Sequence, residues 1–130
     1  MSRLIRGVAA LALALTLAAG TTGCAAEYDR TEITAGTRPA LFPGRVDRQT
    51  IQVTNGMVVT AHIVSYNDDN NIMTMSLRAT DATVLDVSNV ISDHDFAFIG
   101  LKVGTTEVEI LADNKVVLVI PVTVVPQPAP

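Results

Sequence analysis

Residues 49–125 alternate apolar and polar side chains with a period of two, and turn residues interrupt this pattern at short intervals. Val, Ile and Thr dominate, and no stretch keeps the 3.6-residue apolar period of a helix. Such alternation is typical of antiparallel sheets that keep one face in water. The pattern therefore predicts an all-β fold. The positions that it groups on one face of their strands are Met57, Val59, Ala61, Ile63, Met73, Met75, Leu77, Phe96, Phe98, Thr106, Val108, Ile110 and Ala112.

We expect seven short strands in this region. Their predicted ranges are Gln49–Val53, Met57–Ser65, Ile72–Arg78, Thr83–Val87, Phe96–Lys102, Thr105–Ala112 and Lys115–Val125. Asp113 and Asn114, between the last two, are typical of a two-residue hairpin turn. Pro121 inside the last strand predicts a sheet edge or a bulge, because proline has no N–H to donate. Seven short strands favour an antiparallel β-sandwich.

Residues 1–23 have the features of a secretory signal peptide. Arg3 and Arg6 make the start basic, and the run from Val8 to Ala19 carries no charge. This run is too short for a membrane-spanning helix, which needs about 20 apolar residues. A buried core helix is the alternative interpretation of the same run.

Cys24 is the only cysteine, so the chain forms no internal disulfide and no Cys-rich zinc site. The stretch Thr21-Thr22-Gly23-Cys24 resembles the lipobox of bacterial lipoproteins. The resemblance implies cleavage before Cys24, acylation of its thiol and of the new N-terminus (palmitate is one such chain), and a membrane anchor without a spanning helix. Ordinary signal-peptidase cleavage after Gly20 or after Ala26 is the alternative, and it would make the protein secreted and soluble.

The domain organisation that we expect has four parts. After the signal peptide, residues 24–44 read as a lipidated N-terminus and flexible linker, because polar residues, Gly36, Pro39 and Pro43 interrupt regular structure. Residues 45–126 form the sandwich, and residues 127–130 are a proline-rich tail. If the host has two membranes, Ala25 rather than Asp after the cysteine favours the outer membrane.

Two stretches resemble bacterial immunoglobulin-like domains of the group 2 type. In Leu77–Val87, Leu77 stands where that family has tryptophan, Asp81 where it has aspartate, and Val84 and Val87 at its paired valines. Gly100–Ile110 resembles the Gly-x-Lys-x-Gly-x-Thr-x-Ile turn and strand of the family. The resemblance covers roughly residues 49–125 and implies an immunoglobulin-like β-sandwich in a cell-surface or envelope module, which acts as a stalk, spacer or binding unit and not as an enzyme.

Composition limits the partners. The chain has 130 residues, room for one domain, and 48% are hydrophobic, which argues against intrinsic disorder. Its formal net charge is −4, and cleavage after Gly23 would remove Arg3 and Arg6 but no acidic residue. No cluster of Lys and Arg is present, so we expect no nucleic-acid partner.

Few residues are candidates for chemistry. The histidines are His62 and His94, and no Gly-x-Ser-x-Gly elbow accompanies them. Glu107 and Glu109 lie two apart on the predicted polar face, where they keep a strand soluble. Asp93 and Asp95 flank His94 and share one face of an extended segment. With the loop residues Asp68 and Asp69, they are the candidate ligands of a calcium ion. The alternative is a solvated connecting turn.

We therefore expect a non-catalytic, lipid-anchored module of the cell envelope that acts in binding or spacing. Its expected partners are the membrane, through the acyl chains on Cys24, and an envelope protein or a surface glycan. No cofactor is expected beyond the covalent lipid. The alternatives are a docking subunit of an envelope assembly and a calcium-binding surface domain that uses Asp93 and Asp95.

Overall fold

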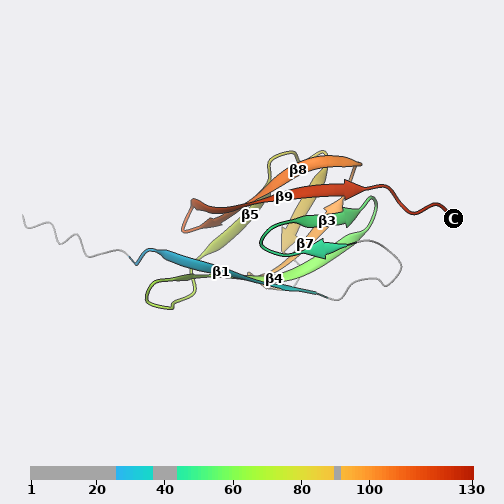
Figure 1. The fold of residues 1–130 in the computed structure, drawn as a ribbon. Coiled ribbons are helices and arrows are strands. Elements are labelled where there is room, and N and C mark those ends of the chain that lie inside the picture. The colour runs from blue at the N-terminus through green and yellow to red at the C-terminus, as the bar shows by residue number, and fades with distance from the viewer. Residues whose placement is uncertain (1–25, 37–43, 90–91) are drawn as a thin grey trace, which may run out of the picture.

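The computed structural model describes residues 26–36, 44–89 and 92–130, which form two β-sheets packed face to face (Figure 1). The strands are β1 (Tyr28–Ala35), β2 (Arg45–Val46), β3 (Ile51–Thr54), β4 (Val58–Asn67), β5 (Met75–Ala79), β6 (Leu85–Asn89), β7 (Asp95–Gly100), β8 (Gly104–Ala112) and β9 (Lys115–Val125). Sheet A has the order β1-β4-β7-β6, and sheet B has the order β2-β3-β9-β8-β5. The predicted all-β sandwich is confirmed.

One strand pair differs from the predicted antiparallel arrangement. β3 and β9 run parallel, with Ile51 beside Val122 and Thr54 beside Val125. Parallel neighbours need a long crossover connection. Here the whole chain between β3 and β9 makes that connection, through both sheets.

The core lies between the two sheets and follows the predicted alternation. Phe96 and Phe98 on β7 are its largest fully buried side chains. Leu77, at the position of the family's tryptophan, is half-buried and packs against this core. Other predicted core positions are also buried, namely Val59, Ala61, Ile63, Val108, Ile110 and Ala112.

The predicted hairpin turn between β8 and β9 is confirmed. Ala112 pairs with Lys115, and Asp113 and Asn114 between them have φ values of 48° and 64°. A two-residue turn in which both residues have positive φ matches the right-handed twist of its strands. Aspartate and asparagine tolerate this conformation better than other non-glycine residues.

The flexible linker predicted over 24–44 is wrong for residues 28–35, which form β1. β1 pairs with β4 along its length, from Tyr28 beside Asn67 to Ala35 beside Ala61. Thr31 is buried, and its hydroxyl hydrogen-bonds to that of Ser65 at 2.8 Å. A strand at the edge of a sheet covers little of the core and needs few apolar side chains. The polar sequence of β1 therefore gives no alternating pattern from which a strand could be predicted.

The prediction that Pro121 marks a sheet edge or a bulge is confirmed for the edge, because no described strand pairs with one side of Pro121. β9 lies between β3 and β8 in sheet B, but β3 pairs with it only from Val122 onward. The bulge is not at Pro121, since the register shift between β8 and β9 falls at Ile110 and Leu111. Pro121 lies opposite Glu107 and just before Val122, where pairing with β3 begins. No residue of β3 is in register with Pro121, so its missing N–H interrupts no bond to that strand.

The structure describes the C-terminal end of the chain, and at the N-terminal end it begins at residue 26. The predicted signal peptide and Cys24 lie outside the described residues. β9 ends at Val125, and Gln127 in the tail donates a hydrogen bond from Nε2 to the carbonyl oxygen of Asn55 at 3.0 Å. Within the described ranges, no helix is long and apolar enough to cross a membrane.

Candidate functional site

The two histidines lie close together near the start of β7. The β4–β7 register places His62 directly opposite Asp95, and His62 Nδ1 lies 2.9 Å from Asp95 Oδ1. Ser92 donates from Oγ to the other carboxylate oxygen at 2.6 Å. The ring of His94 meets that of His62 edge to face, with 6.1 Å between the ring centroids. The hydrogen bond from Ser92, and then that from His62, hold the pKa of Asp95 below its ordinary value.

This cluster has the residue types of a nucleophile triad but not its order. In a triad the histidine contacts the serine and takes its proton. Here Asp95 lies between Ser92 and His62 and bonds to both. The carboxylate therefore accepts from the hydroxyl of Ser92, so the contact fixes the turn before β7 without activating a nucleophile.

The structure does not bring together the four aspartates predicted as calcium ligands. Asp93 and Asp95 lie at the start of β7, opposite the middle of β4, whereas Asp68 and Asp69 follow the end of β4. At about 3.3 Å per residue, the two pairs are separated by on the order of 15 Å along the strand. Among the described residues, no group of three or more His, Cys, Asp or Glu is placed to hold a metal.

Asp68 instead fastens its loop to the start of β1. Its carboxylate accepts the N–H of Glu27 at 3.0 Å, and its own N–H donates to the carbonyl oxygen of Glu27 at 2.8 Å. These reciprocal bonds explain how the polar loop after β4 is held against sheet A.

The predicted outward face of β8 is confirmed. Glu109 pairs with Arg78 on the neighbouring strand β5, and Glu107 is exposed beside Pro121. Glu109 is thus held in an ion pair with Arg78 across the β5–β8 pairing.

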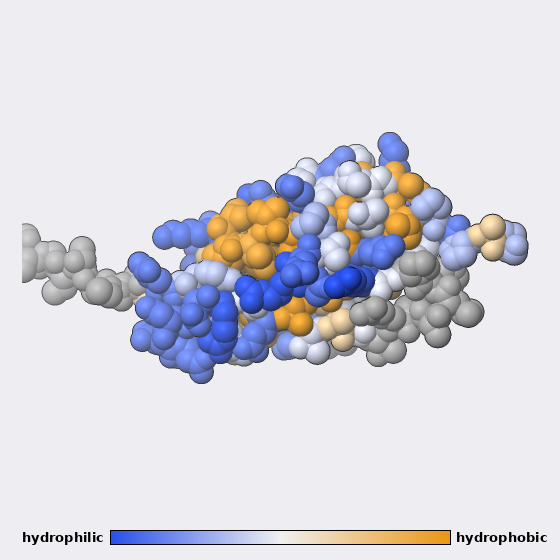
Figure 2. Space-filling model, viewed as in Figure 1, coloured by the Kyte–Doolittle hydropathy of each residue, from blue (hydrophilic) through white to orange (hydrophobic). Residues whose placement is uncertain are grey.

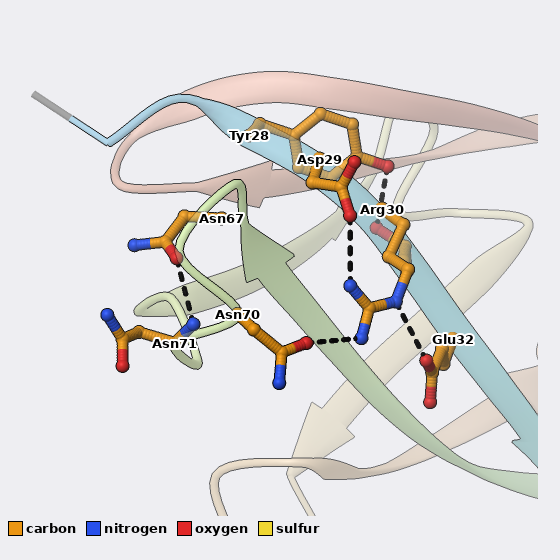
Figure 3. Close-up of polar contacts among 8 residues, drawn as sticks. Tyr28, Asp29, Arg30, Glu32, Asn67, Asn70 and Asn71 are labelled. Carbon is orange, nitrogen blue, oxygen red and sulfur yellow. Dashed lines mark hydrogen bonds and ion pairs between the residues drawn. The ribbon is translucent and has the colours of Figure 1, made fainter. Parts of the chain in front are cut away.

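A polar network surrounds Arg30, which lies in the region that the sequence predicts to be a linker and so was not among the predicted site residues. Figure 3 shows the guanidinium of Arg30 bonded to Asp29, Glu32 and Asn70, at 2.9, 2.9 and 2.7 Å. It also lies 4.3 Å from the ring centre of Tyr66. Both carboxylates raise the pKa of Arg30 and occupy its donors. The network therefore ties β1 to the loop after β4.

An apolar surface and a cleft lie where β9 begins. Val116 and Val119 are 45% and 43% exposed. Figure 2 shows apolar side chains gathered there, next to the hydrophilic loop after β4. A cleft of about 730 Å³ opens beside them, lined by Glu27, Asp113 and Val117 among others. Exposed apolar side chains and a cleft therefore lie next to each other at the start of β9.

Comparisons with known proteins find similarity in structure. No protein-family model matches the chain, and no curated protein matches its sequence. The structure of surface layer protein SbsC, domains 1-6, matches with a TM-score of 0.58 and 17% identity over 81% of this chain. Domains 4-9 match with a TM-score of 0.54 and 22% identity, and domains 4 and 5 with 0.52 and 19%, each over 72% of this chain.

The chain shares its fold with domains of a surface layer protein. The matches cover 14%, 15% and 54% of those chains, so this chain spans less than two thirds of their length. The common fold is an immunoglobulin-like β-sandwich, as the resemblance of Leu77–Val87 and Gly100–Ile110 implies.

Proposed function

We propose that this chain is an exported, lipid-anchored domain of the cell envelope that works by binding or spacing and not by catalysis. The observation that carries the proposal is the immunoglobulin-like sandwich, which the chain shares with domains of a surface layer protein. The basic, then apolar, N-terminal sequence that ends at Cys24 supports export and an acyl anchor.

The arrangement of the polar groups supports a role without catalysis. Asp95, Glu109 and Arg30 each bond to neighbouring side chains on the exposed outer surface of the sandwich. Apolar side chains stand exposed instead at the start of β9. A domain that presents an apolar surface on a rigid sandwich is suited to contact another molecule.

The test is the mass of the protein as its own cells produce it. We expect intact-mass measurement and N-terminal peptide mapping to find a start at Cys24 with the added mass of acyl chains. A matched Cys24→Ala variant is expected to lose both the added mass and its sedimentation with membranes. A wild-type protein that starts at Thr21 or Glu27 and stays soluble would contradict the lipid anchor and make this a secreted domain.

A further inference from the structure

The first half of β9 has a neighbouring strand on one side. β8 pairs with β9 from Lys115 to Val124, but β3 pairs with it only from Val122 to Val125. Figure 1 shows β3 beside the half of β9 that leads to the C-terminus. Across the described ranges, no strand pairs with the other side of residues 115–121. We call that side of residues 115–120 the open edge of β9. The backbone groups along such an edge can pair with another chain.

After Lys115, the side chains of the open edge are all apolar. Val116 and Val119 stand exposed, and Val117 and Leu118 between them are half-buried. Val119 lies opposite the outward-facing Glu109, so it belongs to the outer face of sheet B. An exposed run of consecutive apolar residues on an edge strand is a hazard unless a partner covers it. Figure 2 shows this apolar surface continuing over the start of β9.

Both ends of the open edge are closed. At one end, the turn of residues 47–50 leads into Ile51, which lies beside Val122, and Pro121 has no N–H to donate. At the other end stands the hairpin of Asp113 and Asn114. These limits leave room for one short strand, about 20 Å long.

The cleft at the hairpin end favours a partner with a positive charge. Three acidic residues line the cleft, namely Glu27, Asp68 and Asp113, with one basic residue, Lys115. Val117 of the open edge lies in the same lining. A strand that continued from the edge into this cleft would therefore be favoured by a basic residue at that end.

A second copy of this chain fits the open edge poorly. Pairing two copies of β9 about a two-fold axis brings the turn of residues 47–50 of each copy against the hairpin of the other. The overlap is then shorter than the edge itself. An extended peptide segment carries no such turn beside it and can use the whole edge.

We propose that the open edge of β9 binds one added strand from another polypeptide, an inference that rests on the proposed binding role. The partner segment is extended, has apolar residues at alternate positions, and carries Lys or Arg at the end that meets the cleft. Backbone hydrogen bonds along the edge hold it, and Val116 and Val119 select its apolar side chains.

The test uses a displayed library of short random peptides against the folded domain. Val119→Lys is the disrupting variant, and Val116→Lys is a second one in case the first folds poorly. Val58→Lys is the matched control, because Val58 is 42% exposed but lies on β4 of sheet A. Circular dichroism checks that each variant folds. We expect enriched peptides that alternate apolar residues, end in Lys or Arg, and bind Val119→Lys roughly tenfold more weakly than wild type.

Two further readouts locate the binding. Bound peptide should slow amide hydrogen exchange in residues 115–120 and leave β1, β5 and β6 unchanged. Asp113→Asn should weaken basic-ended peptides and leave neutral-ended ones unaffected.

Four outcomes would overturn the inference: no enriched peptide, equal binding by Val119→Lys, protection at another edge, or self-association that Val119→Lys abolishes. The last would make a second copy the occupant. A soluble, unlipidated protein that still binds these peptides would refute the anchor of the proposed function and leave the open edge standing.

Discussion

Gly100 ends β7 at a point where β3 and β9 of sheet B approach its backbone. A Cβ atom there would lie 2.9 Å from the carbonyl oxygen of Thr54 and 3.0 Å from Cγ1 of Val124. We expect Gly100→Ala to lower the free energy of unfolding by about 1–3 kcal/mol, because a backbone oxygen and a packed valine must move. Urea denaturation measures this, with Ser88→Ala on the exposed side of β6 as the control. Equal midpoints for Gly100→Ala and wild type would show that the close approach relaxes without cost.

Asp95 should make folding sensitive to acid. Its pKa is lowered by the hydrogen bond from Ser92 and then by His62, so its contribution to stability is present above the ordinary carboxyl pKa and is lost as pH falls through the lowered value. We expect Ser92→Ala to raise the pKa of Asp95 towards that ordinary value. The variant should therefore be less stable than wild type near neutral pH and approach it in acid.

Carboxyl chemical shifts measured by NMR against pH test this expectation. Asp81 is the internal control, because Thr83 lowers its pKa and Ser92 plays no part there. An unchanged pKa of Asp95 in Ser92→Ala would show that a group other than Ser92 keeps this pKa low.

The contact between His62 and Asp95 shows what residue patterns leave out. The alternation places His62 on the exposed face of its strand, and its side chain is 51% exposed. Its partner depends on the register between β4 and β7, where a slip of one residue would turn the two side chains to opposite faces. The spacing of Asp93, His94 and Asp95 in the sequence suggests a metal motif. The register between β4 and β7, which pairs Asp95 with His62, cannot be seen in the sequence.

At the scale of single elements, the hairpin before β9 depends on left-handed backbone. Asn114 has a φ of 64°. We expect Asn114→Ala to cost about 1 kcal/mol, because alanine pays a steric penalty in this conformation. Asn114→Gly should be neutral or stabilising, since Asp-Gly is a preferred pair for this turn. Thermal unfolding compares the two, and equal losses for both would assign the effect to the asparagine side chain.

β1 should behave as part of the sandwich. We expect a chain that begins at Thr37 to be much less stable than one that begins at Glu27. Removing β1 exposes the edge of β4 and leaves the hydroxyl of Ser65 without Thr31. Urea denaturation of the two chains measures the difference. Equal free energies of unfolding for the two chains would show that residues 28–35 do not stabilise the sandwich and act as a linker.

The strands differ in how far sequence can predict them. Strands with two or more buried apolar residues in alternation, such as β4, β8 and β9, were predicted close to their observed ranges. β1 was not, because only Thr31 is fully buried in it and its other residues are polar or partly exposed. The parallel pairing of β3 with β9 was also not predicted, since alternation shows which face is buried and not which strand is the neighbour.

The molecule as a whole should unfold as one unit. Both sheets contribute to one core cluster, from Val46 and Ile51 to Phe98 and Val124. We expect circular dichroism and tyrosine fluorescence to give coincident unfolding curves. Tyr28 and Tyr66 both belong to the β1–β4 pair, so fluorescence reports the release of β1. A fluorescence transition at lower urea concentration would show that β1 separates first.

The position of β9 also sets how the domain carries a pulling load. The chain enters at the start of β1 and leaves at the end of β9, and Figure 1 shows these points at opposite ends of the sandwich. A pull between them acts along the strands. At Val122–Val125, β9 is held by β3 and by β8, so tension there must shear hydrogen bonds on both sides together. These two sets of hydrogen bonds act as a mechanical clamp when the domain is pulled from its two ends. The lifetime of the folded domain under force is set by the rate at which these bonds break.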